Sequence, residues 1–462
     1  MKIVIINSPL FREENSRYDE DSLPPIGLGY IATSVKNAGI AVELIDAVDQ
    51  RIPLDRLVEL VDTIKPDFLA TNIFTTNAQL VREMVEKIDF KTHIVIGGLS
   101  TKDIYNEIIS WSTGNQIDVV VGDGELIILD ILNNRLEEKP VLEMNKRRVF
   151  NVFSNSTYYV KDIDKVQLDR SFFKNEPVAH PFGFMEANIV ASRGCIFNCT
   201  FCAAARSINK EFGIRERSAK SLISEIKDIL AEYPHLQSIR VLDDLFLKNS
   251  RSIELATLVF SHFDLKWRSM AHVTTFNKVD RAILLKLKQS GCNELFIGIE
   301  SGSPKILKSI NKTHNVKLII DNLTEVLKAG INIKGYFIYG FPKETSEDME
   351  LTFQLASALQ RNALKYGAEF RTSVFQYRPY HGTAIYHDLV DQGLYKDSIN
   401  LEPDDDLSDL IGRLQFNFHT ANHSEVDEVI VHDYIYRTTN LTNLEIFSGI
   451  KKTARPKKTD FM

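Results

Sequence analysis

Two series of short apolar runs, separated by amphipathic stretches, constrain the fold of this chain more than any other feature of its sequence. The runs of the first series are rich in valine and isoleucine and cover residues 2–7, 42–47, 68–74, 92–98 and 118–122. Continuous apolar runs of this length are typical of strands buried on both faces of a parallel sheet. Helical stretches such as 26–39, which ends at a glycine, separate them. The alternation predicts an α/β fold that begins with a doubly wound, Rossmann-like sheet, which binds ligands at the carboxyl ends of its strands.

The second series predicts another parallel sheet. Ser218 can cap a helix over 218–230, in which the apolar residues share one face. A barrel of parallel strands has its active site at the carboxyl ends of those strands. We therefore expect a partial, TIM-like (β/α)6 barrel built from strands at 187–193, 237–243, 265–273, 293–300, 331–340 and 370–377.

These patterns divide the chain into four parts. We expect the Rossmann-like domain at 1–140, an interdomain linker at 141–185, the barrel at 186–385 and an α-rich region with a basic tail at 386–462. The linker is assigned because its sequence is polar and weakly periodic. Its aromatic residues indicate that it packs on something, and they include Phe150, Phe153, Tyr158 and Tyr159.

Composition excludes several classes of protein. A chain of 462 residues predicts two or three domains. Its net charge of −7 argues against a sequence-independent nucleic-acid binder. No apolar run approaches the roughly 18 residues that span a bilayer, and the first residues lack the pattern of a signal peptide. We therefore expect a cytoplasmic protein without nucleic-acid or membrane partners, and we interpret the basic run at 451–458 as a solvated chain end rather than a phosphate-binding site.

Three of the four cysteines lie in one short loop, SRGCIFNCTFCA, at residues 192–203. Cys195, Cys199 and Cys202 form a C-x3-C-x2-C pattern, whereas Cys292 stands apart and is interpreted as a small buried hydrophobe. Structural zinc normally needs four ligands, and a disulfide would leave one of the three thiols over. An iron–sulfur cluster that leaves one iron open to an outside ligand fits three thiolates better. The loop therefore favours a site of chemistry over a structural metal site.

The cysteine loop resembles that of the radical S-adenosylmethionine (SAM) enzymes. Phe201, the aromatic residue before the last cysteine, is part of this resemblance, as is the position of the loop after the first barrel strand. Segments 241–246, 298–303 and 334–345 resemble later motifs of the same family, in the same order. The resemblance implies a 4Fe-4S cluster on the three cysteines, SAM bound to its fourth iron, and an external reductant such as flavodoxin or ferredoxin.

The same resemblance implies contacts to SAM. Asp243 and Asp244 correspond to the segment that reaches the SAM amino group, Glu300 and Ser301 to the ribose contact, and Lys334 to the fifth strand of the barrel. The two aspartates could instead cap the following turn. Their position at the barrel mouth, where an ammonium group would need an anionic partner, favours the binding role.

The first domain resembles the cobalamin-binding domain of B12-dependent radical SAM proteins, stretch by stretch over 24–47, 64–76, 93–102 and 119–127. Glycines would let the backbone approach a bulky nucleotide tail. A glycine-punctuated sheet edge without a ligand is the alternative. The resemblance implies cobalamin-binding residues among Asn72, Thr75, Thr76, Gly97, Gly98, Gly122, Gly124 and Glu125.

Two departures from the family pattern stand out. The loop at 7–25 lacks the D-x-H-x-x-G motif with which many cobalamin proteins supply a histidine ligand to cobalt. The lower face of cobalt would therefore meet water or another side chain. His381 replaces the proline that the family usually has after the sixth strand. It could contact substrate or donate a proton, although a lone histidine is more often structural.

The resemblance as a whole implies a cobalamin-dependent radical SAM methyltransferase. Such an enzyme cleaves SAM to a 5′-deoxyadenosyl radical and uses methylcobalamin to methylate an unactivated carbon or a phosphinate in a small-molecule or peptide substrate. The same modules could instead catalyse a rearrangement, ring contraction or cyclisation without methylation. A cobalamin-binding sensor is a third possibility, but the complete set of Cys195, Cys199 and Cys202 with Asp243 and Glu300 argues against it.

Overall fold

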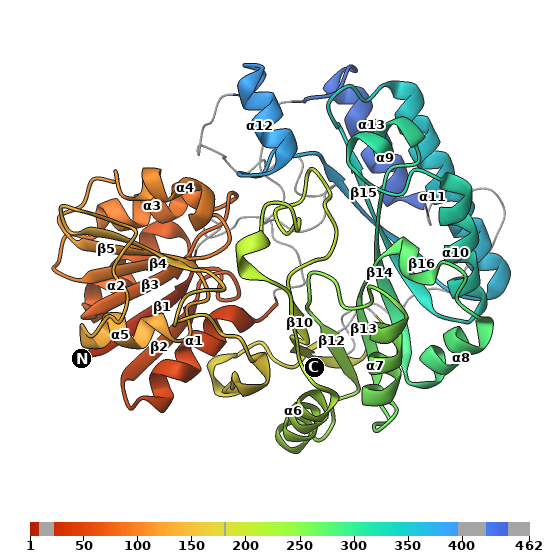
Figure 1. Cartoon of the computed structure of the whole chain (residues 1–462). Helices are drawn as coiled ribbons and strands as arrows, with labels where there is room; N and C mark the ends of the chain where they lie inside the picture. The colour runs from red at the N-terminus through yellow and green to blue at the C-terminus, as the bar shows by residue number, and fades with distance from the viewer. Residues whose placement is uncertain (9–22, 180–181, 396–421, 442–462) are drawn as a thin grey trace.

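The structure, a computed structural model, describes residues 1–8, 23–179, 182–395 and 422–441. Those residues contain two seven-stranded sheets and a small two-stranded sheet. Figure 1 shows the first sheet with its helices in red and orange, beside a larger α/β domain in green and blue. The two-domain α/β architecture predicted from the two series of runs is confirmed.

The first sheet has the strand order β2-β1-β3-β4-β5-β7-β6. Its first five strands run parallel to one another. From β1 the chain adds β2 on one side and then β3, β4 and β5 on the other, so the strand order reverses between β1 and β3. Ligands bind at such a switch point, beyond the carboxyl ends of the strands. These five strands match the predicted runs and are β1 (Lys2–Asn7), β2 (Ala41–Asp46), β3 (Phe68–Asn72), β4 (His93–Gly97) and β5 (Gln116–Gly122).

Helices cover both faces of this sheet because alternate strand residues point to opposite sides. On one face, Ile3, Ile5 and Val120 pack with α1 (Ile26–Asn37) and α5 (Ile127–Asn133). The opposite face packs against α2 (Leu54–Ile64), α3 (Ala78–Lys87) and α4 (Thr101–Ile108).

The first domain extends beyond the boundary predicted at residue 140. Residues expected in the linker form β6 (Leu142–Met144) and β7 (Arg147–Val152), and β7 pairs in parallel with β5. The strand was missed because it begins with two arginines. Arg148 forms a double hydrogen bond to the buried Asp118 of β5, at 2.8 and 2.6 Å. As predicted, the aromatic residues that follow pack on this domain, and its core includes Phe150, Tyr158 and Tyr159.

The second sheet has the strand order β16-β15-β14-β13-β12-β9-β8. Six of its strands are parallel, and β9 and β16 do not pair, so the sheet is an open, partial barrel as predicted. The short β8 (Val178–Ala179) joins its edge in the antiparallel direction. The parallel strands are β9 (Met185–Ile189), β12 (Ser238–Val241), β13 (Lys266–Ala271), β14 (Cys292–Glu300), β15 (Asn332–Tyr339) and β16 (Phe370–Gln376).

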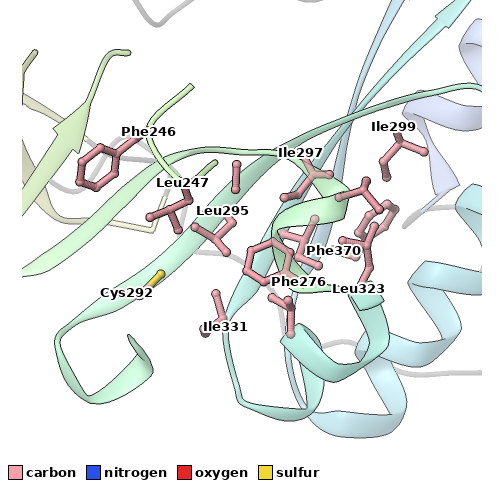
Figure 2. Packing of buried hydrophobic residues seen from close by; sticks show 14 of the residues in the cluster. Phe246, Leu247, Phe276, Cys292, Leu295, Ile297, Ile299, Leu323, Ile331 and Phe370 are labelled. Carbon is pink, nitrogen blue, oxygen red and sulfur yellow. The ribbon is translucent and has the colours of Figure 1, made fainter. Parts of the chain in front are cut away.

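Helices pack on the outer face of the partial barrel. Figure 2 shows Leu295, Ile297 and Ile299 of β14, which belong to the same apolar core cluster as the helix residue Leu323. Cys292 lies in the same core with 0% exposure, and burial raises the pKa of its thiol. The interpretation of Cys292 as a buried hydrophobe is confirmed. The helices are α6 (Ala219–Glu232), α7 (Ser250–Phe260), α8 (Arg281–Gln289), α10 (Val316–Lys328) and α11 (Ser346–Tyr366).

The described part of the C-terminal region completes the barrel wall. Helix α13 (Glu428–Thr439) packs against β16 and α11. Thr438 ties it to the sheet, because its hydroxyl lies 2.7 Å from that of Tyr339 and its carbonyl accepts a 2.8 Å bond from Thr372. The acidic stretch at 402–409 and the basic run at 451–458 lie outside the described residues. Among the helices that the structure describes, none has the length and apolar character needed to cross a bilayer.

Candidate functional site

The three cysteines lie in the loop that follows the first barrel strand and the short β10 (Ser192–Arg193). Cys199 is 9% exposed, and all three thiols are free. The loop is closely folded: the amide of Cys202 donates to the carbonyl of Cys199 at 3.2 Å, and that of Phe197 reaches the sulfur of Cys195 at 3.5 Å. The sequence spacing therefore produces one compact turn that carries all three sulfurs.

Two later segments of the chain form hydrogen bonds with the outer side of this loop. The amide of Thr200 donates to the carbonyl of Ile310 at 3.2 Å, just beyond α9 (Pro304–Ser309), and the side chain of Asn311 donates to the carbonyl of Asn198 at 2.8 Å. At the start of α12 (Ala384–Asp391), the amide of Ile385 donates to the carbonyl of Thr200. The loop is thus fixed at the carboxyl end of the barrel, where the fold rule places an active site.

Aromatic rings support the loop from the barrel side. Phe201 meets Phe341 edge to face, with ring centroids 5.7 Å apart. Phe197 stacks on His272 with centroids 3.7 Å apart. Burial, together with the nearby Lys312, lowers the pKa of His272 to about 3, so its ring is neutral at physiological pH. These contacts hold the loop through apolar packing.

The thiols themselves are poor candidates for free thiolates. Burial raises the pKa of all three, and that of Cys202 reaches about 12. A bound metal centre would replace the protons and supply the missing positive charge. No set of three or more His, Cys, Asp or Glu side chains within the described ranges is arranged around a single metal ion. Cys195, Cys199 and Cys202 are of the residue type that holds iron–sulfur clusters, in which each sulfur binds a different iron.

Lys312 is a residue of this site that the sequence did not reveal. Its ammonium lies 3.0 Å from a carboxylate oxygen of Glu300 and donates to the carbonyl of Gly298 at 2.9 Å. Burial lowers its pKa, but Glu300 and the neighbouring thiols outweigh this effect, so the pKa is raised. A buried cation beside Cys199 stabilises negative charge on the sulfurs. No motif marks a single lysine in a loop, and Glu300 was expected to face a ribose rather than this ammonium.

The two adjacent aspartates after β12 have different surroundings. Asp243 is buried and accepts hydrogen bonds from the amide of Ala191 at 2.7 Å and the hydroxyl of Ser192 at 2.6 Å. Burial raises its pKa to about 6. Asp244 keeps part of its surface exposed beside the backbone of Gly194, and desolvation of its carboxyl group raises its pKa. Asp243 therefore holds the strand that enters the cysteine loop, whereas Asp244 is open to a ligand.

Ser301 and Lys334 occupy different positions in the barrel. Ser301 has 0% exposure, and its hydroxyl lies 3.0 Å from that of Thr352 and accepts from the amide of Ser303. Lys334 is half-buried on β15, with its ammonium 5.6 Å from the centre of the Tyr336 ring. The structure thus gives Ser301 a role inside the fold and leaves Lys334 partly accessible.

A cavity of about 470 Å³ opens at the carboxyl edge of the first sheet. It reaches between the sheet and helices α1 and α5, and its polar lining includes Asn7 and Asn72. Ligand sites are commonly apolar hollows of this size with a few polar groups. The apolar lining consists mainly of Ile5, Leu28, Ile31, Ala70, Val95, Val120, Ile127 and Ile128.

Most of the residues predicted to bind cobalamin line this cavity. The side chain of Asn72 donates to that of Asn7 at 3.0 Å. Thr75 and Thr76 are buried but are not part of the lining. The hydroxyl of Thr75 instead accepts a 3.4 Å bond from the amide of His381, so it contacts the barrel domain. The predicted residues in the lining are Asn72, Gly97, Gly98, Gly122, Gly124 and Glu125.

Two of these glycines are required by the protein's own backbone. Gly98 and Gly122 have φ angles of +112° and +117°. A Cβ at Gly98 would lie 2.6 Å from the carbonyl oxygen of Ile73, and one at Gly122 would lie 2.5 Å from that of Val152. Gly97, in contrast, has no close protein neighbour and lines the cavity. The alternative of a sheet edge that needs glycine without binding a ligand thus explains Gly98 and Gly122. Gly97, in contrast, is accessible to a ligand.

Ion pairs connect the cavity to the cysteine loop. Arg193 forms ion pairs with Asp123 at 2.9 Å and with Glu125 at 2.5 Å. Arg215 of the short strand β11 (Arg215–Glu216) also pairs with Asp123. Arg193 lines the cavity and lies two residues before Cys195. The sequence did not reveal this network, because its arginines and carboxylates lie in different domains. It places the cavity directly beside the loop.

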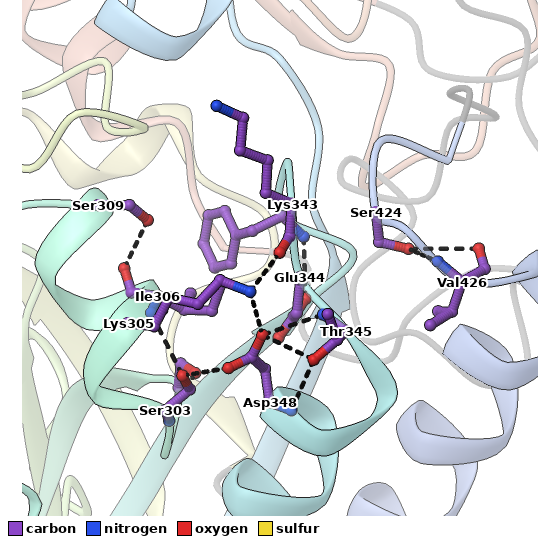
Figure 3. Close-up of polar contacts among 12 residues, drawn as sticks. Ser303, Lys305, Ile306, Ser309, Lys343, Glu344, Thr345, Asp348, Ser424 and Val426 are labelled. Carbon is purple, nitrogen blue, oxygen red and sulfur yellow. Dashed lines mark hydrogen bonds and ion pairs between the residues drawn. The ribbon is translucent and has the colours of Figure 1, made fainter.

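A buried carboxyl group lies in the turn after β15. Figure 3 shows Glu344 in this turn, beside Lys343 and Thr345. Glu344 has 0% exposure, and one oxygen accepts from the amides of Gly340 at 2.6 Å and Phe341 at 3.0 Å. Burial raises its pKa to about 8.

Glu344 predicts a pH-dependent stability. The unfolded chain releases this proton near pH 4.5 and the folded chain near pH 8, so the folded state binds more protons between these values. The contribution of Glu344 to stability is fully present below about pH 4.5 and is lost, by roughly a few kcal/mol, as the pH rises through about 8. Glu344→Gln cannot ionise, so we expect it to match wild type in acid and to exceed it at alkaline pH. Urea unfolding at both ends of the range measures this; parallel profiles would contradict it.

Comparison with known proteins gives two matches in chain order. Residues 19–132 match the B12 binding domain, and residues 189–356 match the radical SAM superfamily. An uncharacterized methyltransferase from Pyrococcus horikoshii is 28% identical over 411 residues, which covers 85% of this chain and 84% of the relative.

Two solved structures are similar in fold. The cobalamin-dependent SAM radical enzyme OxsB, with aqua-cobalamin and SAM bound, superposes with a TM-score of 0.62 at 16% identity, over 98% of this chain and 69% of OxsB. The radical SAM methyltransferase TsrM from Kitasatospora setae, with cobalamin and a 4Fe-4S cluster, has a TM-score of 0.58 at 14% identity, over 85% of this chain and 75% of TsrM. With a B12 binding domain followed by a radical SAM barrel, the chain belongs to the B12-domain-containing radical SAM enzymes.

Proposed function

We propose that the chain is a cobalamin-dependent radical SAM methyltransferase that acts on an unactivated carbon or a phosphinate of a small-molecule or peptide substrate. The observation that carries this proposal is Arg193, which lines the cavity of the B12 domain and precedes Cys195 by two residues. One residue would thus border both of the proposed cofactor sites. When bound, SAM on the reduced cluster supplies a hydrogen-abstracting radical, and methylcobalamin supplies the methyl group.

The residues of the loop fit the cluster and SAM. Cys195, Cys199 and Cys202 would hold three irons, and Lys312 would offset part of the charge of the cluster. Asp244, exposed beside Gly194, is the carboxylate best placed to bind the amino group of SAM. Asp243 would act indirectly, by holding the backbone at Ala191 and Ser192.

The edge of the first sheet fits cobalamin. The apolar cavity is large enough for the aromatic base of a nucleotide tail, and Asn7 and Asn72 offer polar contacts at the carboxyl edge. Large apolar side chains follow the strands at the same edge: Phe74, Leu99 and Leu126 are 40%, 51% and 43% exposed. Exposed apolar groups gathered at one edge are typical of a ligand-binding surface, and a flat macrocycle would cover them.

The identity of the group below cobalt is predicted from the sequence alone. Most of the loop at 7–25 lies outside the described residues, which resume at residue 23. The printed sequence of this loop contains no histidine. A protein side chain other than histidine, or water, would therefore lie below cobalt if this loop faces it.

The names of similar proteins support methyl transfer. The relative from Pyrococcus horikoshii and TsrM are both methyltransferases by name, whereas OxsB is named only as a radical enzyme. Methyl transfer and a reaction without methylation differ in their second product. Methylation converts one SAM to S-adenosylhomocysteine for each substrate methylated, whereas both reactions cleave SAM to 5′-deoxyadenosine.

The test is anaerobic turnover of reconstituted protein with SAM, a reductant and candidate substrates. We expect cobalamin to copurify and S-adenosylhomocysteine to form in step with 5′-deoxyadenosine. Formation of 5′-deoxyadenosine alone would favour the rearrangement or cyclisation alternative. Bound cobalamin without either product would favour a sensor.

A further inference from the structure

The side chain of Arg193 contacts the wall of the first-domain cavity, whereas its backbone leads into the cysteine loop. The guanidinium donates to Asp123 at 2.9 Å and to Glu125 at 2.5 Å, through two different nitrogens. Both carboxylates lie in the loop after β5 and line the cavity. Gly194 and Cys195 follow Arg193 directly. A displacement of this residue would therefore disturb a part of each proposed cofactor site.

Arg193 is held more firmly than a surface ion pair would be. The side chains of Asp123 and Glu125 are only 9% and 6% exposed, and that of Arg193 is 21% exposed. Its guanidinium also lies over the ring of Tyr30, 5.5 Å from the ring centre, and Tyr30 belongs to α1 and lines the cavity. Solvent ions screen partly buried pairs much less than exposed ones, and two hydrogen bonds from one planar group fix its orientation. The first domain thus holds Arg193 in one position and one orientation.

The residues on either side of Arg193 hold the two aspartates that follow β12. The hydroxyl of Ser192 donates to Asp243 at 2.6 Å. The backbone of Gly194 forms a hydrogen bond with the carboxylate of Asp244, which is the proposed partner of the SAM amino group. The position of Asp244 therefore depends on a backbone that Arg193 ties to the other domain.

We propose that Arg193 is a positioning residue, which sets the separation and relative orientation of the cobalamin site and of the site for the cluster and SAM. The inference rests on the proposed function, because this separation matters only when both sites are filled. Methyl transfer needs the two sites at one working distance, since a misplacement of about 1 Å can slow a reaction by about a hundredfold.

A second ion pair between the domains provides a matched comparison. Lys102 of α4 pairs with Glu211 at 3.2 Å, and their side chains are 27% and 44% exposed. Neither residue lines the cavity, and Glu211 lies nine residues beyond Cys202. Lys102→Gln therefore removes a contact between the domains without changing the cavity wall or the support of Asp244.

The test measures the magnetic interaction between the two cofactors, which requires no knowledge of the substrate. Reconstituted protein is loaded with hydroxocobalamin and reduced with dithionite, so that cob(II)alamin and the reduced cluster each carry unpaired spin. The dipolar coupling between the two spins falls with the cube of their separation and depends on their relative orientation. Electron paramagnetic resonance of cob(II)alamin therefore reports the geometry that Arg193 is proposed to set. Equilibrium dialysis with radiolabelled SAM measures the affinity of the neighbouring site.

We expect Arg193→Gln to lose the spin coupling and to bind SAM about tenfold more weakly, the effect of losing one charge-assisted hydrogen bond. Arg193→Lys keeps the charge but cannot hold two carboxylates in a fixed orientation, so we expect it to lose part of the coupling. Lys102→Gln should behave as wild type does. Iron content, cobalamin content and melting temperature show whether each variant is folded and loaded.

Arg193→Lys decides the outcome if Arg193→Gln does not fold. A coupling equal to that of wild type in every folded Arg193 variant would overturn the positioning role. An equal loss in Lys102→Gln would also overturn it, because the effect would then belong to any contact between the domains. Wild-type protein that carries both cofactors without coupling would overturn the positioning role alone. Wild-type protein that binds no cobalamin, or assembles no cluster, would overturn the proposed function and the positioning role with it.

Discussion

Replacing Cys199 by alanine is expected to abolish cleavage of SAM. Cys199 has the least exposed side chain of the three loop cysteines and lies at the centre of the turn, with Lys312 nearby. Two remaining thiolates would leave two irons without a protein ligand, so the cluster should not assemble. Iron should fall from about four atoms per chain to well below one after anaerobic reconstitution, and formation of 5′-deoxyadenosine should fall to background.

Cys292 offers a matched control, since Cys292→Ala also removes one thiol. Cys292 packs in the apolar core at the first residue of β14, whereas the loop lies at the carboxyl end of the barrel. We expect this variant to keep its iron and its activity, and to lose about 1–2 kcal/mol of stability through the smaller side chain. The assignment of the cluster would be wrong if Cys199→Ala retained iron and the broad absorption at the blue end of the visible spectrum.

Filling the cavity of the first domain is expected to block cobalamin and leave the cluster intact. Ala70 lies on β3, is 7% exposed and lines the cavity. In Ala70→Phe the new ring would occupy the space proposed for the nucleotide base. Losing roughly 3 kcal/mol of binding free energy from apolar contacts would weaken cobalamin binding about a hundredfold. Absorbance titration of the apoprotein with cobalamin measures this affinity, and methyl transfer should be lost while 5′-deoxyadenosine still forms.

Ala41→Phe is the control for this prediction. It introduces the same ring on the edge strand β2, which β1 separates from β3, at an exposed position outside the cavity. It should bind cobalamin as wild type does. Melting temperatures of the apoproteins show whether either ring disturbs the fold, because overpacking a filled core would cost about 1–3 kcal/mol. Unchanged affinity in a well-folded Ala70→Phe variant would mean that cobalamin does not use this cavity.

The sheets were predictable because their strands are continuous apolar runs. Burial on both faces selects such runs, and no knowledge of distant contacts is needed to recognise them. Strand β7 was not recognised as an apolar run, because its first two residues are Arg147 and Arg148. Their charges are acceptable only because backbone carbonyls and the buried Asp118 of β5 receive them. That compensation depends on tertiary pairing and is invisible in a local pattern.

The candidate site was predictable to the extent that it is local. The three cysteines lie within eight residues, so their spacing alone indicates a shared ligand. Arg193 and Asp123 are 70 residues apart in sequence and meet only in the fold. The different surroundings of Asp243 and Asp244 could not be predicted either, because the two carboxylates are adjacent in sequence. Only the fold shows that Asp243 accepts hydrogen bonds from Ala191 and Ser192.

The ion pairs between Asp123, Glu125, Arg193 and Arg215 restrict how such proteins can be recombined. A chimera that joins this B12 domain to another barrel would leave two carboxylates without partners at the junction, at a cost of several kcal/mol if they stayed buried. The four residues would have to be exchanged together. The two halves of the chain therefore match each other at this junction, and a library of domain fusions should be built around it rather than around the linker.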